Sequence, residues 1–419
     1  MHNDFPLEKS TISRDPACWF CVAGGRGVAT RCRINTHPVI RGLGALSVLG
    51  SGVAAHLSAC SESTSRFRPL AGLLGNDSPH ARLHAAWIDD RRALIHRMWS
   101  PASMAARLVA REAASDAGWS AADLRDTALV VGTSRGNAAG WLSPWPGRRP
   151  FRTMAVSNTI HNEPASAISI DLGIRGPGHV QASGCSAGLD ALGVALMMLA
   201  AGKAPRAIVA AVDLPLVPAL LDGYTASGLL SGRSRLDPYG PDCDGFIPGE
   251  AAAAIAIETT GDAADIRLID HLGNTDARNP LAIPPDGGRT PDMLEQAAAC
   301  HGDPAVVIPH ATGTAAQARA EKAVFARAFP GAKPSVCLLK PRLGHTLGAS
   351  GLVETVLFAA FLREGLVPPD MPGITRPPGM GSANPPVPGA YIWKLAHSLG
   401  GHNSLLVIQS PPSPHPQTT

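Results

Sequence analysis

An α/β fold is predicted by the alternation of strand-like and helix-like stretches along the 419 residues of the chain. Three strand-like stretches, 128–132, 207–213 and 251–258, are apolar and lack the polar alternation of a half-exposed strand. Strands of this kind are buried on both faces, as in layered α/β folds. With 45% hydrophobic and 16% charged residues, the chain has enough apolar material for two core-forming halves.

The first predicted elements follow a stretch without periodicity. Residues 1–32 mix charge, Gly and Cys without the apolar core of a signal peptide, and they are predicted to form a poorly ordered extension. A strand is expected from Pro38, ending in a Gly-punctuated turn. Residues 101–118 are predicted to form an amphipathic helix, because Pro begins the stretch and Gly ends it. Residues 158–172 are also predicted to be helical.

The second half of the chain loosely echoes the first. Its predicted strands and helices are 305–310, 315–329, 336–339, 350–363, 391–393 and 405–408. Residues 259–302 show no legible pattern. We therefore expect two similar halves, 33–258 and 259–410, followed by a Pro-rich, disordered tail at 411–419.

Charge and cysteine usage exclude several classes of function. The net charge is only +3 and no dense Lys/Arg run occurs, which argues against a nucleic-acid partner. The eight cysteines are scattered, and the pair Cys18 and Cys21 has no second pair at zinc-site spacing. Free thiols in a reducing, cytoplasmic compartment are expected. No apolar run is long enough to span a membrane.

Cys185 lies at the junction of a small apolar run and an alanine-rich helical pattern, 187–202. This order predicts strand, sharp turn and helix, with the cysteine at the turn. The positive end of a helix dipole favours thiolate over thiol, and small neighbours let a substrate approach closely. The stretch alone fits a covalent nucleophile and a buried structural cysteine about equally.

Four further stretches carry polar groups: 244–250, 310–314 with Glu321 following, 340–345, and 399–404. Together with the Cys185 stretch, their order and spacing resemble β-ketoacyl-acyl carrier protein synthases of the decarboxylating, two-histidine class, in the thiolase-like superfamily. The resemblance covers about residues 34–409. It implies a thiolase-like fold of duplicated α/β halves in a layered αβαβα arrangement.

The resemblance also implies roles for individual residues. Cys185 occupies the position of the acyl-accepting nucleophile, and His310 and His345 occupy those of the two histidines that bind the malonyl thioester carbonyl. Lys340 occupies the position of the family's lysine before the second histidine. Glu321 occupies the position of the acid that pairs with this lysine.

Substrate-binding positions follow from the same resemblance. Thr312 and Thr314 fall where the pantetheine arm is hydrogen-bonded. Leu399 falls where the family has a gating Phe, next to Gly400. The backbone N–H of Leu399, with that of Cys185, would make the oxyanion hole.

The chemistry of these residue types agrees with the implied reaction. Two neutral imidazoles with N–H groups pointing inward stabilise a developing enolate without a metal ion. A cation such as Lys340 fixes the electrostatics of the site, with Glu321 balancing its buried charge. We therefore expect no metal and no cofactor, because the substrates arrive on the phosphopantetheine of acyl carrier protein.

The chain departs from the family pattern in ways that favour a specialised paralogue. Ala311 follows the first histidine where a Gly is usual, and His397-Ser398-Leu399 replaces a Phe-Gly-Phe run. Arg135 falls in a loop that lines the acyl pocket in the family, where small or apolar residues are common. At this point the alternatives of a pocket role and a solvent-facing side chain stay open.

Four functions compete on these observations. The predicted one is decarboxylative Claisen condensation of an acyl chain on Cys185 with malonyl-acyl carrier protein, in fatty acid or type II polyketide or aryl polyene-like biosynthesis. The alternative is a non-catalytic, chain-length-type subunit, but such partners typically lose the nucleophile. A thiolase needs a second cysteine near residues 399–404, and an acetyl-CoA-primed synthase has Asn in place of His345.

The predicted partners are an acyl carrier protein and a second ketosynthase subunit, identical or related. Carrier proteins are acidic, so their docking site should be basic. Candidates are Arg66, Arg68, Arg148, Arg149, Lys203 and Arg206.

Overall fold

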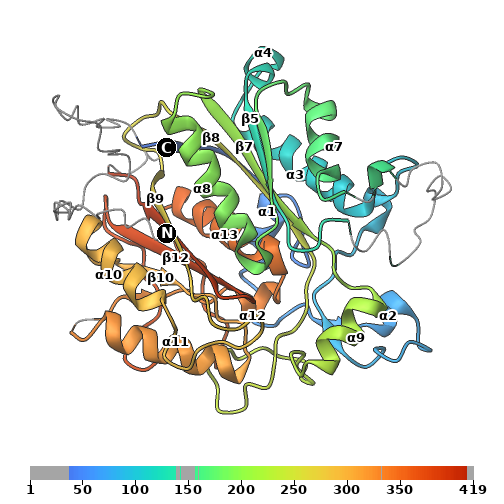
Figure 1. The fold of residues 1–419 in the computed structure, drawn as a ribbon, viewed down its shortest axis with the longest axis vertical. Helices are drawn as coiled ribbons and strands as arrows, with labels where there is room; N and C mark the ends of the chain where they lie inside the picture. Colours follow the sequence, from blue (N-terminus) through green and yellow to red (C-terminus); the bar gives the residue numbers. More distant parts are fainter. Residues whose placement is uncertain (1–36, 138–141, 143–155, 159, 332, 413–419) are drawn as a thin grey trace, which may run out of the picture.

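The computed structural model describes residues 37–137, 142, 156–158, 160–331 and 333–412 (Figure 1). The predicted extension at 1–32, with its cysteine pair, lies outside the described residues, as does most of the predicted tail. None of the helices in the described ranges has the length and apolar character that crossing a membrane requires.

The two halves of the chain form the same arrangement of strands, which confirms the predicted duplication. In the described residues eleven strands form one sheet, whose main path is β11-β10-β12-β13-β9-β1-β8-β7-β5-β6. Numbered within its own half, each run of five has the order 3-2-4-5-1. In each half, the second strand pairs in parallel with the third and fourth, and the fifth pairs antiparallel with the fourth and first.

The bounds of the strands are as follows. The first half contains β1 (Val39–Ser47), β5 (Ala128–Gly132), β6 (Gly178–Gln181), β7 (Arg206–Asp213) and β8 (Ala251–Glu258). The second contains β9 (Arg267–Thr275), β10 (Val306–Ile308), β11 (Ser335–Val336), β12 (Tyr391–Ser398) and β13 (His402–Gln409). Three further strands of two residues each are β2 (Gly50–Ser51), β3 (Arg68–Pro69) and β4 (His84–Ala85).

Helices make three further layers, so the fold has the predicted αβαβα order (Figure 1). The middle layer, which contacts both halves of the sheet, is α8 (Ala187–Ala200) and α13 (Ser350–Arg363). One outer layer is α3 (Pro101–Asp116) with α7 (Glu163–Leu172), and the other is α10 (Thr290–His301) with α11 (Ala315–Ala328).

The remaining helices are short. They are α1 (Val53–Ala59), α2 (Ala71–Leu74), α4 (Ala121–Arg125), α9 (Pro218–Ala226) and α12 (Lys340–Leu343), with the 3₁₀ turns η1 (Arg91–Leu94), η2 (Gly184–Ser186) and η3 (Leu347–Ala349).

Small residues allow the layers to approach closely. A Cβ added to Gly42 or Gly44 of β1 would lie 1.9 or 2.1 Å from a carbonyl oxygen of α3. The middle helix α13 is buried over nearly its whole length, and α8 buries Ala and Gly against β5 and β7. The glycine- and alanine-rich composition therefore serves tight packing of helix on sheet.

The region that showed no legible pattern contains two regular elements, β9 and α10. Strand β9 was missed because it is only partly covered, so its burial follows neither a buried run nor a strict alternation. The helix predicted over 158–172 begins later, at Glu163, where Pro164 occupies the first turn. The boundary after residue 258 stays a prediction, and it falls in the connection between β8 and β9.

Candidate active site

Cys185 lies on the predicted turn between a strand and a helix. Strand β6 ends at Gln181, η2 carries the cysteine, and α8 begins at Ala187. Gly184 has φ +67°, a conformation that L side chains rarely adopt, so glycine suits this turn. The cysteine packs against a cluster formed by Tyr224, Phe246 and Leu347.

The environment of Cys185 does not favour the thiolate. Burial raises the pKa of the thiol to about 12, and the Asp213 carboxylate adds to this effect while Arg135 and Lys340 oppose it. The prediction that the helix terminus would favour thiolate is therefore wrong for the resting site. The thiol stays protonated at neutral pH, and it must lose its proton during acyl transfer.

Asp213 joins the two halves of the molecule next to the nucleophile. It ends β7, and its carboxylate accepts hydrogen bonds from Thr133 Oγ1 and from the backbone N–H groups of Ser134, Arg135 and Gly348. The first three donors belong to the loop after β5, and the fourth belongs to η3 of the second half. One carboxylate thus fixes two loops that border Cys185.

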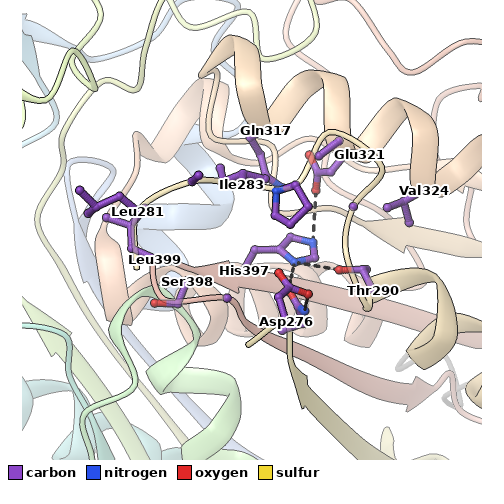
Figure 2. A pocket seen from close by; sticks show the side chains of 16 residues that line it. Asp276, Leu281, Ile283, Thr290, Gln317, Glu321, Val324, His397, Ser398 and Leu399 are labelled. Atoms are coloured by element: carbon purple, nitrogen blue, oxygen red, sulfur yellow. Dashed lines mark hydrogen bonds and ion pairs between the residues drawn. The ribbon is translucent and has the colours of Figure 1, made fainter. Parts of the chain in front are cut away.

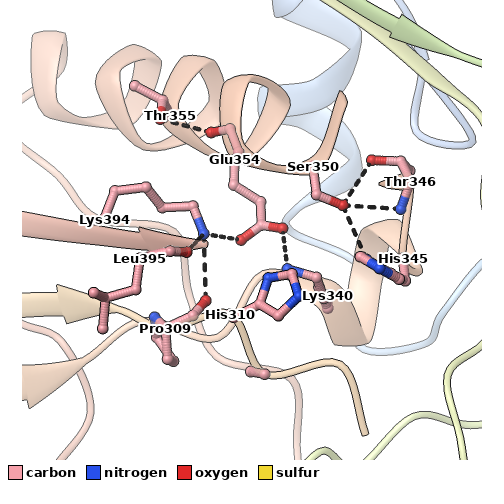
Figure 3. Close-up of polar contacts among 12 residues, drawn as sticks. Pro309, His310, Lys340, His345, Thr346, Ser350, Glu354, Thr355, Lys394 and Leu395 are labelled. Atoms are coloured by element: carbon pink, nitrogen blue, oxygen red, sulfur yellow. Dashed lines mark hydrogen bonds and ion pairs between the residues drawn. The ribbon is translucent and has the colours of Figure 1, made fainter. Parts of the chain in front are cut away.

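His345 follows the short helix α12, and its ring orientation is set by neighbours on both sides (Figure 3). Its Nδ1 lies 3.1 Å from Oγ of Ser350, the first residue of α13. Its ring meets Phe246 edge-on at 5.0 Å and His310 edge-on at 5.2 Å between centroids. The contact with Ser350 engages Nδ1 and leaves Nε2 for a substrate.

His310 follows β10 and lies beside His345, as the family resemblance implied. Its backbone N–H donates to Glu321, and its buried Nδ1 has no hydrogen-bond partner among the described residues. Burial holds the pKa of both rings well below the usual value, and the Lys340 charge lowers it further. Both imidazoles are therefore neutral at pH 7, the state that the implied chemistry requires.

The prediction that Glu321 pairs with Lys340 is wrong. Lys340 Nζ lies 2.6 Å from Oε1 of Glu354, on α13 (Figure 3). Glu321, on α11, instead accepts from the backbone N–H groups of His310 and Ala311 and from the hydroxyl of Tyr239. The reason is geometric, because α13 passes Lys340 while α11 lies under the loop that follows β10.

A second buried lysine completes this network, and the sequence reasoning missed it. Lys394 Nζ lies 2.8 Å from Oε2 of Glu354, so one carboxylate bridges two lysines. Burial lowers the pKa of Lys394 to about 8. A signal was present in the sequence, since Glu354 and Lys394 each interrupt an apolar stretch, and a buried charge needs a partner.

The segment after His310 is held in a strained conformation. Ala311 has φ +48° and is buried, which fits the glycine that is usual at this position. Thr314 caps α11 by accepting from Gln317 N, and its hydroxyl lies 3.3 Å from that of Thr312. The pantetheine roles of Thr312 and Thr314 stay predictions.

The tip of the β12–β13 hairpin borders the nucleophile. Leu399 is 36% exposed and lines a pocket with Leu281 and Ile283 (Figure 2). Gly400 follows with φ +90°. The N–H of Cys185, predicted to face an oxyanion, donates to the side chain of Ser398 at 3.1 Å.

His397 brings a third imidazole to the histidine pair. Its ring centroid lies 5.7 Å from that of His310, and its Nδ1 lies 2.9 Å from Oδ1 of Asn403. Its Nε2 faces Glu321 at 4.0 Å (Figure 2). The sequence showed His397 as a departure from the family pattern but assigned it no role.

Arg135 turns toward the cluster beside Cys185. Its Nε donates to the Tyr224 hydroxyl at 3.1 Å, and its guanidinium lies 5.6 Å from the centre of the same ring. Tyr224 in turn meets Phe246 edge-on at 5.6 Å. The hydrogen-bond partner of the Arg135 guanidinium is thus a phenol and not a carboxylate, so this contact does not neutralise the charge of Arg135.

Three of the six proposed basic docking residues pair with acidic side chains. Arg66 pairs with Glu62, Arg68 with Asp89, and Arg206 with Asp123 and Glu258. Arg206 begins β7 and Lys203 follows α8, so both lie at the end of these elements opposite Cys185. Arg148 and Arg149 lie outside the described residues. The docking surface stays a prediction.

The described residues contain no group of three or more His, Cys, Asp or Glu side chains arranged to hold a metal ion. The polar groups around the histidines instead bond to one another and to the backbone. What the site offers is one buried thiol and two neutral imidazoles beside a positively charged network.

A layered duplicated fold with this site defines a condensing enzyme of the thiolase-like class. The chain belongs to the β-ketoacyl synthase family, and it is an acyltransferase. The family's N-terminal domain matches residues 86–263 and its C-terminal domain matches residues 271–373.

Named relatives agree with this assignment. The 3-oxoacyl-[acyl-carrier-protein] synthase 2 of Mycobacterium tuberculosis is 27% identical over 322 residues, covering 71% of this chain and 77% of its own. The protein of the same name from Staphylococcus aureus is 26% identical over 431 residues, covering 90% and 98%.

Solved structures show the same fold. One is a type II polyketide ketosynthase bound to a hexaketide and in complex with its acyl carrier protein, with a TM-score of 0.73 and 19% identity. Another is the ishigamide ketosynthase/chain length factor, with a TM-score of 0.74 and 19% identity. Each comparison covers 90% of this chain and 99% of the other.

Proposed function

We propose that this protein elongates acyl chains by decarboxylative condensation, with Cys185 as the acyl acceptor and His310 and His345 as the groups that stabilise the enolate. The observation that carries the proposal is the pair of neutral, buried imidazoles, 5.2 Å apart, against the aromatic cluster on which Cys185 also packs. An enolate oxygen next to two N–H donors in a buried site is stabilised far more than in water.

The reaction proceeds in two balanced stages. In the first, the Cys185 sulfur displaces the pantetheine thiol from an acyl thioester, and the proton of the cysteine leaves with that thiol. In the second, malonyl thioester loses CO₂, and the bonding electrons form an enolate whose oxygen accepts from the two histidines. The enolate carbon then attacks the acyl-cysteine carbonyl, the C–S bond breaks, and the thiolate of Cys185 takes up a proton.

The charged network beside the histidines supports the second stage. Burial keeps both imidazoles neutral, the positive charge of Lys340 lowers their pKa further, and Glu354 holds Lys340 in position. A neutral imidazole donates one N–H to the enolate and needs no proton transfer to do so. The protein's own residues therefore supply the stabilisation, and we propose that the reaction uses no metal and no cofactor.

The partners follow from the family. We propose that acyl carrier protein delivers both substrates, as one structural relative was solved with its carrier protein. We propose a dimer, with itself or with a related ketosynthase subunit, and a cytoplasmic location. Thr312 and Thr314 would bind the pantetheine arm, and Leu399 would gate the acyl site.

The second candidate is a chain-length-type partner subunit. Two observations favour it: the raised pKa of the Cys185 thiol, and the engagement of its N–H by Ser398. Against it stand the cysteine itself and the two buried, adjacent histidines, which a partner subunit has no need to keep.

Arg135 points to the class of acyl chain. A half-buried guanidinium whose hydrogen-bond partner among the described residues is a phenol is better matched by an oxygen on the chain than by a saturated alkyl group. We propose that the preferred acyl groups are short or carry oxygen, and that a carboxylate fits the guanidinium best.

One experiment tests the proposed function. The protein is mixed with acyl carrier protein carrying an acyl chain, and its intact mass is measured. Wild type should gain the acyl mass, and Cys185→Ala should not. Cys185→Gln should still decarboxylate malonyl-acyl carrier protein. An adduct on Cys185→Ala, or no adduct on wild type, contradicts the proposal.

A further inference from the structure

The Ser398 hydroxyl accepts a hydrogen bond from the backbone N–H of Cys185, the donor that acyl transfer needs. The N–H of Cys185 donates to Ser398 Oγ at 3.1 Å, across the two halves of the molecule. The hydroxyl is packed closely against the turn, since a Cβ on Gly184 would lie 2.0 Å from it. Ser398 ends β12, whose pairing with β13 holds this residue opposite His402.

Acyl transfer creates a negative oxygen beside the nucleophile. When the Cys185 sulfur attacks a thioester, the carbonyl oxygen becomes an oxyanion that needs N–H donors at about 2.7–3.1 Å. The N–H of Cys185 has one proton, and that proton is already directed at Ser398 Oγ. The substrate oxygen therefore has to displace the serine hydroxyl to use this donor.

We infer that Ser398 competes with the acyl thioester for the Cys185 amide and so slows acylation relative to decarboxylation. The inference rests on the proposed function and deepens it. The enolate of the second stage is held by His310 and His345, which come from other loops and do not use this amide. Ser398 therefore acts on the steps in which a carbonyl at Cys185 becomes an oxyanion, and not on the decarboxylation of the malonyl group.

The hairpin offers the serine a second position. Ser398 lines the pocket that Leu399 and Leu281 also border, so a rotation of its side chain toward this pocket would release the amide (Figure 2). Two glycines follow Leu399, Gly400 with φ +90° and Gly401 with φ +77°. Binding of an acyl group would favour the turned side chain, and departure of the product would let the hydroxyl return.

The test separates the two stages in the full-length protein. Ser398→Gly and Ser398→Ala remove the hydroxyl, Ser398→Thr keeps it, and Ser61→Ala changes an exposed serine that touches none of these groups. Single-turnover acylation is followed by intact mass, using acyl-acyl carrier protein. Malonyl-acyl carrier protein decarboxylation is measured on the same variants. Alkylation of Cys185 by iodoacetamide serves as a control, because it forms no oxyanion.

We expect the acylation rate to rise while the rates of decarboxylation and alkylation stay nearly constant. Acylation should be about 3–10-fold faster in Ser398→Gly and Ser398→Ala, because displacing one hydrogen bond typically amounts to that factor. Ser398→Thr and Ser61→Ala should match wild type. Decarboxylation and alkylation should change less than twofold in all four variants.

Acylation that is unchanged or slower in both Ser398→Gly and Ser398→Ala overturns the inference, and a slower rate would show that the hydroxyl donates to the oxyanion. Equal acceleration of alkylation also overturns it, because that result would mean easier access to the thiol. Failure of the proposed function is recognised separately, by an adduct that survives Cys185→Ala or by the absence of decarboxylation in wild type.

Discussion

The two halves of the molecule build the same local structure for different chemistry. Each half places a 3₁₀ turn before a middle-layer helix, η2 before α8 and η3 before α13. The first turn carries Cys185, whose thiol has a raised pKa and whose backbone N–H donates to Ser398. The second follows a neutral imidazole that Ser350 holds in place. The cysteine is thus restrained in the resting protein, while the ring of His345, proposed to stabilise the enolate, is already oriented.

The largest expected effect concerns the network behind the histidines. Glu354→Gln leaves Lys340 and Lys394 buried and close together without a carboxylate, so the free energy of unfolding should fall by about 3–5 kcal/mol. Denaturant unfolding measures this change. Glu364→Gln, at the exposed end of α13, is the matched control and should have little effect. A loss below about 1 kcal/mol would mean that the lysines do not depend on Glu354.

Removing one imidazole tests the second half directly. His345→Ala should lower the rate of malonyl decarboxylation by about 10²–10³-fold, because an N–H donor to the enolate is lost. Acylation of Cys185 should change much less. His179→Ala, on the exposed edge strand β6, is the control. Decarboxylation at the normal rate in His345→Ala would contradict the assigned role.

The raised pKa of Cys185 predicts a slow, pH-dependent reaction with iodoacetamide. Its thiol pKa of about 12, against an ordinary value of 9.0, leaves a thousandth of the usual thiolate at pH 8. Higher nucleophilicity offsets part of this loss, so alkylation should be on the order of 10–100-fold slower than for a free cysteine thiol. The rate should keep rising above pH 9, measured by peptide mass mapping. A plateau below pH 8 would show a depressed pKa instead.

The same shift affects stability at high pH. The folded-state pKa of Cys185 lies above the ordinary value, so this thiol contributes stability that is fully present below about pH 9 and is lost as the pH rises toward 12.

A smaller effect is expected at the acyl side of the nucleophile. Arg135→Ala should shift the preference between oxygenated and saturated acyl groups by about 10-fold toward saturated ones, since one charge-assisted contact is lost. Acylation rates across a panel of acyl-carrier substrates measure this. Arg125→Ala, at the exposed end of α4, should leave the profile unchanged. An unaltered profile in Arg135→Ala would mean that the guanidinium serves Tyr224 alone.

The smallest expected effect is a gain in stability. Ala311 has φ +48°, so Ala311→Gly should relieve strain and raise the free energy of unfolding by on the order of 0.5–1 kcal/mol, net of the flexibility that glycine adds to the unfolded chain. Denaturant unfolding measures it. The same change at Ala298, which lies in helix α10, should destabilise the protein. Destabilisation by Ala311→Gly would show that the methyl group packs favourably.

Residues that act within one stretch of chain could be predicted from the sequence. Cys185, His310, Lys340 and His345 each follow a recognisable strand or turn, and the structure brings the two histidines together. The α/β class followed from the order of buried strands, and the duplicated layers followed from the family resemblance. The information came from the order of five stretches that resembles the ketosynthase family, and the roles of the four residues stay predictions.

Residues whose role depends on a distant partner could not be predicted in this way. Glu354 reaches Lys340 and Lys394 only because α13 and β12 pack side by side, and Glu321 was chosen in its place. The contact between Cys185 and Ser398 joins positions 213 residues apart. The pKa of the thiol was also misjudged, because burial by other layers outweighs the local helix.

The long separation between Cys185 and Ser398 has a consequence for synthesis on the ribosome. The turn that carries the cysteine emerges 213 residues before the strand end that caps its amide. The carboxylate of Asp213 likewise accepts a hydrogen bond from the N–H of Gly348, which is synthesised 135 residues later. A nascent chain that has made only the first half therefore carries a cysteine whose surroundings are incomplete. The surroundings of Cys185 are complete only after β12 has been synthesised and has docked.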